Sequence, residues 1–242
     1  MKEGASLLGV LRIPEKPSVV FTKQSISNYP VRMHNAYTRH TIHEITNPVV
    51  SSIANTSKKR RRFGQGNIIS KGQKMPVPCA KPIICAGWDV KNPQCDVDIS
   101  AFLIDTNNKI IGDEWFVFYG QTDSPDNSVH LDCNGTQNDD KIIHIDTTKI
   151  DGRVKKIVFV LTIDEAETKR LNFSMLCNAY IRILDNDTEL FRFLLNDYYE
   201  SVTSMMLGEL YLHNNQWKFN AIGNGVKRDL AGLCEMYGVQ TE

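Results

Sequence analysis

The chain has 242 residues, 41% of them hydrophobic, so we expect one large domain with a substantial core. Its formal net charge of zero hides an asymmetry, because residues 1–65 contain eleven Lys and Arg against three acidic residues, which leaves seventeen against twenty-five in the remainder. The apolar run at 5–11 is too short to span a membrane and is cut off by Arg12 and Pro14 without a cleavage signature, so we expect a cytoplasmic protein without membrane insertion.

Residues 1–65 mix short β-prone pieces with several prolines, which is typical of an extension or linker. The segment ends in a basic run that consists of Lys58, Lys59, Arg60, Arg61 and Arg62. Such a run binds a polyanion or a partner surface, or it is simply a solvated charge run. Because few aromatic residues are interleaved with these charges, a protein partner or docking onto the acidic remainder of the chain is favoured over nucleic acid.

The cysteines and histidines give no metal motif of their own. The six cysteines contain no C-x-x-C pair, and most lie in apolar segments, so buried free thiols are expected rather than disulfides or metal ligands. His34, His40 and His43 are six and three residues apart, and this spacing does not suit a metal pair on a helix or a strand.

From residue 67 onward, short apolar runs alternate with turn-forming residues such as those at 107–108, 124–127 and 151–152. The strands predicted from this pattern cover residues 67–70, 82–88, 95–104, 115–119, 142–145, 154–163, 172–184, 189–195, 206–212 and 217–222. The helical crossovers that a parallel sheet would need are absent. The pattern therefore predicts an all-β sandwich rather than an α/β fold.

Three shorter segments interrupt or end the series of strands. The acidic residues at 164–167 suit the first turn of a short helix. Residues 185–189 begin like a calcium-binding loop but have Leu190 where glycine is needed, so a hairpin turn is predicted there. Apolar residues from Val226 to Tyr237 recur at helical spacing, and Gly238 follows as a stop, which predicts an amphipathic helix at the C-terminus.

Two acidic segments are the candidate functional site. Asp96 and Asp98 lie two residues apart in a predicted strand, so their carboxylates point to the same face and repel unless a cation or a basic partner neutralises them. The loop at 132–140 adds Asn134, Asp139 and Asp140. Hard oxygen ligands without thiolate or imidazole are the preference of calcium, so the two segments together predict a calcium site.

Known catalytic and calcium motifs do not explain these residues. An EF-hand starting at Asp96 fails, because it lacks glycine at its sixth position and has Asn107 in place of the final glutamate. No phosphate-binding glycine loop and no G-x-S-x-G are present, and no Ser, His and Asp arrangement can be identified from spacing. The sequence therefore predicts a protein that is not an enzyme.

Several motifs in order resemble the TerD family of tellurium-resistance and stress proteins over roughly residues 67–240. These motifs are Ile69-Ser70-Lys71-Gly72-Gln73-Lys74, Gly87-Trp88-Asp89, the segment 95–104, Phe116-Val117-Phe118-Tyr119, Asn172-Phe173, Gly208-Glu209-Leu210-Tyr211, Trp217-Lys218-Phe219 and Ala221-Ile222-Gly223. The resemblance implies a calcium-binding β-sandwich in a cytoplasmic bacterial or phage-associated stress system, with no established catalytic reaction. Residues 1–65 fall outside the resemblance, so we expect a basic extension or linker at 1–65 and a TerD-like domain at 66–242.

Carried onto this chain, the acidic strand of the family matches Asp96 and Asp98, and its acidic loop matches residues 132–141. Cys133 stands where the family usually has aspartate, Lys141 stands where it usually has glutamate, and the loop is about three residues shorter. Because cysteine is a poor calcium ligand and lysine adds a repelling charge, one of two sites is expected to be lost or weakened. Asp89 and Glu209 are weaker candidate ligands.

The resulting hypothesis is a calcium-binding, non-enzymatic module of a stress-response complex, with calcium as its cofactor. One alternative is a metal-dependent phosphoester hydrolase, which would need a phosphate-binding cation near the carboxylates, and Lys141 is the obvious one. A second alternative is a nucleic-acid-associated protein that acts through residues 58–62. The acidic residues also have a simpler interpretation, as solvated side chains on a sheet face or at a turn.

Overall fold

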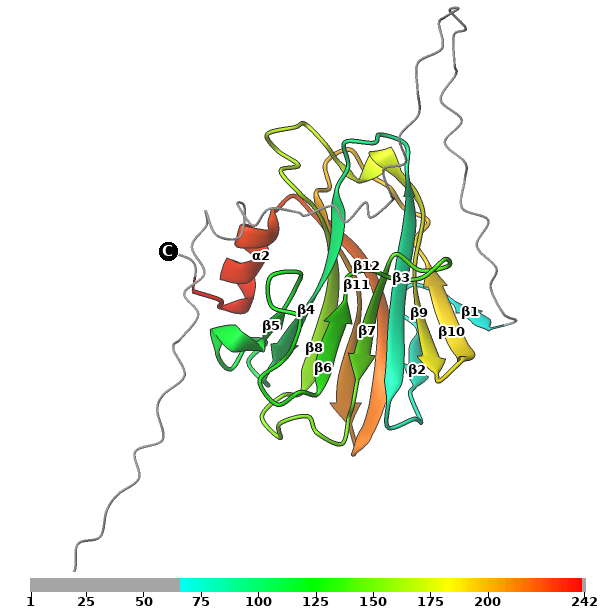
Figure 1. Cartoon of the computed structure of the whole chain (residues 1–242), viewed down its shortest axis with the longest axis vertical. Helices are drawn as coiled ribbons and strands as arrows, with labels where there is room; N and C mark the ends of the chain where they lie inside the picture. The colour runs from blue at the N-terminus through cyan, green and yellow to red at the C-terminus, as the bar shows by residue number, and fades with distance from the viewer. Residues whose placement is uncertain (1–65, 241–242) are drawn as a thin grey trace, which may run out of the picture.

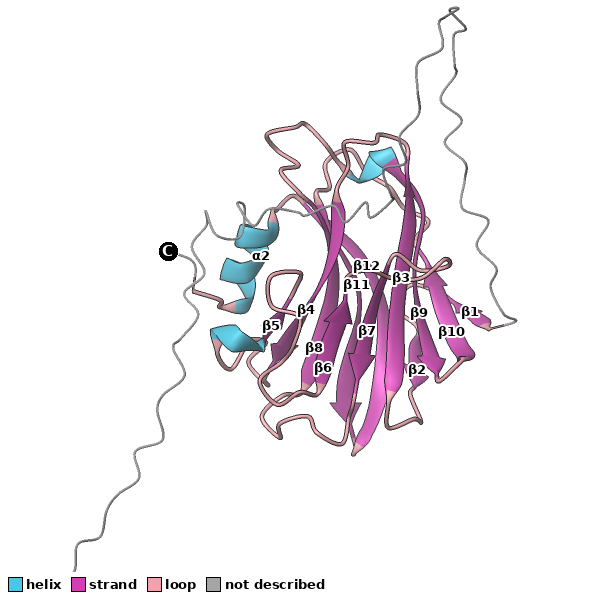
Figure 2. Cartoon of the chain, in the orientation of Figure 1, coloured by secondary structure: helices cyan, strands magenta, loops and turns pink. Residues whose placement is uncertain are grey.

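The computed structural model of the chain describes residues 66–240, and its strands form two six-stranded β-sheets (Figures 1 and 2). The first sheet has the order β1-β10-β9-β3-β7-β6, and the second has the order β2-β12-β11-β8-β4-β5. The elements are β1 (Asn67–Ile69), β2 (Lys74–Pro76), β3 (Pro82–Val90), β4 (Val97–Ile104), η1 (Asp113–Trp115), β5 (Phe116–Val117), β6 (Val129–Asp132), β7 (Lys141–Ile145), β8 (Lys156–Ile163), η2 (Phe173–Met175), β9 (Leu176–Asp185), β10 (Thr188–Leu194), β11 (Ser204–His213), β12 (Gln216–Val226) and α2 (Leu230–Tyr237).

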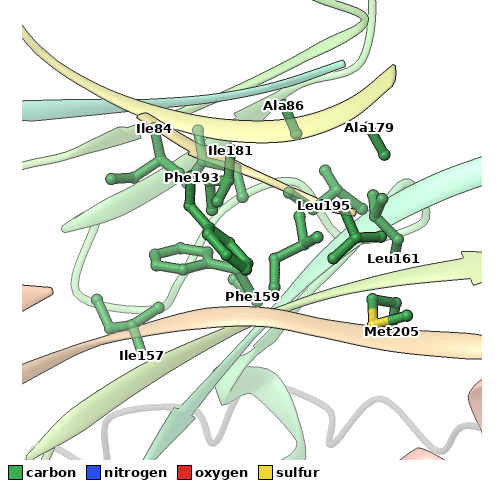
Figure 3. Close-up of a cluster of buried hydrophobic side chains, with 14 of the residues drawn as sticks. Ile84, Ala86, Ile157, Phe159, Leu161, Ala179, Ile181, Phe193, Leu195 and Met205 are labelled. Carbon is green, nitrogen blue, oxygen red and sulfur yellow. The ribbon is translucent and has the colours of Figure 1, made fainter. Parts of the chain in front are cut away.

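The main core lies between the two sheets, as Figure 3 shows for its central side chains. Successive residues of a strand point to opposite faces, so every second residue of an inner strand enters this layer. On the first sheet Ile84 and Ile181 do so, and on the second sheet Ile157 and Phe159. Each of these four side chains is fully buried, which accounts for the apolar alternation in the sequence.

A second, smaller core covers the outer face of the second sheet. Phe102 of β4 and Val158 of β8 point away from the main core and pack with Leu233 and Tyr237 of α2. Figure 1 shows α2 beside β4 and β5 on the outside of the sandwich. The helix therefore explains why β4 and β8 are apolar on both faces, since neither face is left to water.

The predicted C-terminal helix is confirmed, although it begins at Leu230 rather than at Val226. Val226 instead ends β12, where it pairs with Ser204 of β11. The side chain of Asp229 caps the helix by accepting a hydrogen bond from the Gly232 amide. Gly238 ends it with a left-handed φ of 87°, which confirms the predicted stop.

Other local predictions have mixed outcomes. The hairpin turn is confirmed, because β9 ends at Asp185 and β10 begins at Thr188. The helix predicted at 164–167 is wrong, because this segment forms turns in which Glu165 and Arg170 have φ near +50° and interrupt helical geometry. The strand predicted from residue 172 begins with η2, because the Asn172 side chain accepts the Ser174 amide proton.

The remaining global predictions concern thiols and membranes. All six cysteines are free, as predicted, and Cys85, Cys95 and Cys234 are buried. Among the described residues, no helix is long and apolar enough to cross a membrane. Lys58 to Arg62 and the three histidines at 34, 40 and 43 lie outside the described residues.

Candidate functional site

Asp98 forms an ion pair that joins the two sheets. It is the second residue of β4, and its Oδ1 lies 2.7 Å from the Nζ of Lys141, the first residue of β7. The two side chains are only 15% and 17% exposed. Burial alone would lower the pKa of Lys141, but the adjacent carboxylate of Asp98 raises it above its ordinary value. The sequence predicts that a cation or a basic partner neutralises Asp98, and in the structure this partner is Lys141 of the same chain.

Two further carboxylates lie beside this pair. Asp98 of β4 is opposite Thr162 of β8 in the ladder between these two strands. Beyond the end of this ladder, the Asp164 amide donates a 2.8 Å hydrogen bond to the Asp96 carbonyl. Burial raises the pKa of Asp96, and so do the charges of Asp98 and Asp164. Burial also raises the pKa of Asp164, whereas Lys169, 3.6 Å away, lowers it.

We call Asp96, Asp98 and Asp164 the acidic cluster. Lys141 and Lys169 are the cations that act on it, so three carboxylates face two ammonium groups. The sequence predicts Asp96 and Asp98 as site residues but places Asp164 in a short helix instead of in the site. Asp164 could have been found in the sequence because it directly follows β8, an eight-residue apolar strand. Antiparallel pairing of β8 with β4 places the end of β8 beside the start of β4, where Asp96 and Asp98 lie.

Asp139 has a different environment and is only 2% exposed. Its carboxylate accepts hydrogen bonds from Arg182 of β9, with Nε 2.8 Å from Oδ1, and from the hydroxyl of Tyr180 at 2.9 Å. Arg182 also pairs with Glu189, which in turn pairs with Arg192. Asp139 therefore belongs to a buried ion-pair network on the first sheet, and the sequence signal for it is a charged residue at 182 within an apolar run.

The acidic loop is held in place by its own backbone. Gly135 has φ of 61°, and a side chain there would meet the carbonyl oxygens of Asp139 and Asp140 at 2.4 Å. The Thr136 amide donates to the Asp139 carbonyl at 2.7 Å. These contacts turn the loop onto the first sheet, where the Asp140 amide donates to the carbonyl of Ala86.

The other loop candidates lie near this turn. The Oδ2 of Asp140 accepts the amide proton of Trp88 at 2.8 Å, which fixes that carboxylate against the end of β3. Asn134 is exposed, and its amide donates to Asp132. Burial raises the pKa of the Cys133 thiol, and the nearby charges of Lys141 and Asp98 lower and raise this pKa, respectively. The usual aspartate position of the family is thus taken here by a protonated thiol.

Asp89 and Glu209 are held at separate places. The Oδ2 of Asp89 accepts a hydrogen bond from the Asn178 side chain at 2.7 Å, on the first sheet. Glu209 lies on β11 beside Val158 and accepts from Asn220, with Lys156 3.6 Å away. The structure therefore gives each of these weaker candidates a partner of its own rather than a place in the acidic cluster.

The fit of these residues to calcium is uneven. As the side chains lie, no three His, Cys, Asp or Glu within residues 66–240 converge closely enough to hold a metal ion. Asp139 does not fit, because its two oxygens are committed to Arg182. The acidic cluster fits in charge and in donor chemistry but not in the present positions of its side chains, since three carboxylates beside two ammonium groups favour a hard cation.

An all-β sandwich with an acidic cluster at the end of its paired strands is the class of protein that this geometry defines. The TerD domain model matches residues 66–237, and the chain belongs to this family, which confirms the resemblance noted in the sequence. It is 37% identical to a tellurium resistance protein TerD of Serratia marcescens over 185 residues, covering 71% of this chain and 96% of that protein.

Two other comparisons support the same family and fold. The general stress protein 16U of Bacillus subtilis (strain 168) is 34% identical over 187 residues, covering 71% of this chain and 97% of that protein. The crystal structure of a homologue of telluride resistance protein (TerD) from Streptomyces coelicolor A3(2) has a TM-score of 0.51 at 13% identity, covering 65% of this chain and 97% of that one. At that identity the structure supports the fold alone.

Proposed function

We propose that this chain is a non-enzymatic stress-response module that binds calcium at the acidic cluster. The observation that carries the proposal is that burial and the nearby charge of Asp98 raise the pKa of both Asp96 and Asp164, so an added cation would be favourable there. Relatives named as tellurium resistance and general stress proteins support the stress-response part. Six free thiols are consistent with a cytoplasmic location.

Asp96, Asp98 and Asp164 would move together to hold the ion, because their side chains do not converge on one point as they lie. Asp140 and Asn134 are further candidates from the predicted set. Calcium would supply two positive charges in a place where repulsion between carboxylates otherwise costs free energy. Lys141 competes for the same carboxylate, because its ammonium already neutralises Asp98 at 2.7 Å. The proposal therefore includes a calcium affinity that is lowered by this lysine.

The same ion pair supports the proposal that the chain is not an enzyme. A phosphoester hydrolase would need a free cation beside the carboxylates to bind the phosphate, and Lys141 is instead paired with Asp98. The relatives reported above are named for resistance and stress rather than for a reaction. A binding module explains both observations without a further assumption.

The experiment is calorimetric titration and thermal melting of the full chain with Ca²⁺, Mg²⁺ and a chelator. At one hundred times its dissociation constant, Ca²⁺ adds about 2.7 kcal/mol to the free energy of unfolding. Asp96→Asn with Asp164→Asn should abolish this gain, and Lys141→Gln should raise calcium affinity by removing the competing charge. Asp151→Asn is the matched control, because Asp151 pairs with Arg153 away from the cluster.

Wild type and Lys141→Gln that both melt at the same temperature with and without Ca²⁺ would remove the calcium proposal. The stress-response assignment is tested separately, by survival under tellurite and oxidative stress of a strain that lacks the protein. If the variant with Asp96→Asn and Asp164→Asn no longer binds calcium but still protects the strain fully against both stresses, the stress-response role does not depend on calcium binding.

The basic run at 58–62 is proposed to contact a protein partner or the acidic cluster. The charge asymmetry between residues 1–65 and the remainder supports this choice. Deleting residues 1–65 and measuring calcium affinity and DNA binding across a salt series tests it. Unchanged calcium affinity would exclude docking on the cluster, and DNA binding that falls steeply with salt would favour nucleic acid.

A further inference from the structure

His130 and His144 face each other on the outer side of the first sheet. They are directly opposite in the antiparallel ladder between β6 and β7, and their ring centroids are 6.3 Å apart. Val129 and Leu131 of β6 point into the main core, so strand alternation sends His130 outward. Ile143 and Ile145 do the same for His144, and both imidazoles are exposed.

A carboxylate continues this row on the other side of β6. Asp123 forms an antiparallel bridge with His130, so the three residues lie side by side on three adjacent stretches of chain. The Oδ1 of Asp123 lies 2.7 Å from the Nδ1 of His130, and its Oδ2 accepts a hydrogen bond from the Thr122 hydroxyl at 2.8 Å. The hydrogen bond from Thr122 thus holds the Asp123 carboxylate in the position from which it orients the His130 imidazole.

This arrangement has the form of a metal-binding histidine with its orienting partner. A carboxylate on Nδ1 sets the tautomer and the ring direction and leaves Nε2 as the ligand atom. Since metal–nitrogen bonds are about 2.0–2.1 Å long, two rings on one ion at a tetrahedral angle have centroids about 5 Å apart. The rings of His130 and His144 are 6.3 Å apart and inclined by 27°, so a rotation of these two exposed side chains that closes about 1 Å brings both onto one ion.

We propose that His130 and His144 bind one divalent late transition-metal ion, of the copper and zinc class, with water completing the shell and Asp123 as the positioning residue. Imidazole nitrogen suits these ions, whereas calcium takes oxygen ligands, so the two-histidine site is chemically distinct from the acidic cluster. Asp123 does not ligate the ion in this proposal, which agrees with the lack of a three-ligand group among the described residues. The inference does not depend on the calcium proposal.

The test uses the full chain in a background that carries His34→Ala, His40→Ala and His43→Ala, because these three histidines would add imidazoles of their own. Calorimetric titration with Cu²⁺ and with Zn²⁺ measures affinity and stoichiometry, and electron paramagnetic resonance of the Cu²⁺ form reports nitrogen ligands. We expect one ion per chain and a signal from two imidazole nitrogens. Excess Ca²⁺ should leave both unchanged.

Substitutions then assign the residues. His144→Ala should weaken binding at least tenfold and leave one imidazole in the spectrum, and Asp123→Asn should weaken it by about 10 to 100-fold, the usual effect of removing an orienting carboxylate. His213→Ala is the matched control, because His213 is an exposed histidine at the end of β11 on the other sheet, and it should have no effect. Thermal melting without metal confirms that each variant is folded.

A double variant His130→Ala and His144→Ala that binds Cu²⁺ and Zn²⁺ with the stoichiometry and affinity of the background chain would overturn the site. If Asp123→Asn binds as tightly as the background chain, the positioning role of Asp123 is excluded. Binding that Ca²⁺ displaces, or that Asp96→Asn removes, would place the ion at the acidic cluster and likewise overturn the proposal.

Discussion

Arg182 of β9 donates two parallel hydrogen bonds to the carboxylate of Asp139, with Nε–Oδ1 at 2.8 Å and Nη2–Oδ2 at 2.5 Å. The pair lies under the acidic loop, and each residue is less than one tenth exposed. Burial opposes the charge of Arg182, but Asp139 raises its pKa above the ordinary range and keeps it protonated. This ion pair therefore fixes the loop to the first sheet.

Asp139→Ala should destabilise the fold strongly, because it leaves a buried guanidinium without its main partner. Removing one partner of a buried ion pair costs about 3–5 kcal/mol, which urea or thermal unfolding measures readily. Asp151→Ala breaks an exposed pair with Arg153 and should lower stability measurably but several-fold less than Asp139→Ala. Equal, small effects for both variants would contradict the structural role assigned to Asp139.

Gly135→Ala should also destabilise the loop. The residue has φ of 61°, and a Cβ atom would lie 2.4 Å from the carbonyl oxygens of Asp139 and Asp140, so the backbone must move. We expect a loss of more than about 1 kcal/mol in the free energy of unfolding. Gly152→Ala is the matched control, since its Cβ atom would meet nothing within 4 Å. A loss at Gly152 as large as at Gly135 would refute the steric argument.

Stability should fall in acid through carboxylates at turns. The hydrogen bonds from the Arg153 side chain lower the pKa of Asp151 to about 2, and the Arg153 amide adds to this effect. In the unfolded chain an aspartate has a pKa of about 3.9, so Asp151 binds a proton less readily in the folded state than in the unfolded state. The stabilisation by ionised Asp151 is therefore fully present above about pH 4 and is lost as the pH falls toward 2.

Melting temperatures of wild type and Asp151→Asn, measured between pH 7 and pH 2, check this dependence. The difference between the two proteins should be constant above about pH 5 and shrink below pH 4. A difference that grows in acid would contradict the sign.

Leu233→Ala should loosen α2 from the second sheet. Leu233 is fully buried against Phe102 and Val158, and truncating a buried leucine costs about 2–5 kcal/mol. Hydrogen exchange of the α2 amides should accelerate more than that of β3 in the main core. Uniform acceleration across both regions would instead show that α2 unfolds only with the whole domain.

The sequence predicts the strands well where one face enters the main core, as in β4, because alternation alone identifies Val97, Ile99 and Ala101. It misses β2 and β6, which have three and four residues, because so few positions carry no clear period. The short helix predicted at 164–167 fails for a related reason. Its acidic residues satisfy a local helix rule, while the Asp164 amide is already bonded to Asp96, 68 positions earlier.

The candidate site shows the same division between local and distant information. Asp96 and Asp98 share a face because they are two residues apart, and this can be inferred without a structure. The pairing of Asp139 with Arg182 joins residues 43 positions apart, so the charge at 182 within an apolar run signals a buried partner but no local pattern identifies that partner as Asp139. The same holds for Lys141, whose partner Asp98 lies on the opposite sheet.

The borders of both sheets are formed by very short strands, with β1 and β6 on the first sheet and β2 and β5 on the second. None of these four has more than four residues, whereas the neighbouring β10 and β12 have seven and eleven. A long strand with unpaired amides would recruit strands from other molecules and lead to aggregates. The eleven residues at 66–76 thus act as a shield for β10 and β12. A shortened chain that starts after them would lose the buried side chain of Ile69 and expose two long strand edges, and it would be prone to precipitate.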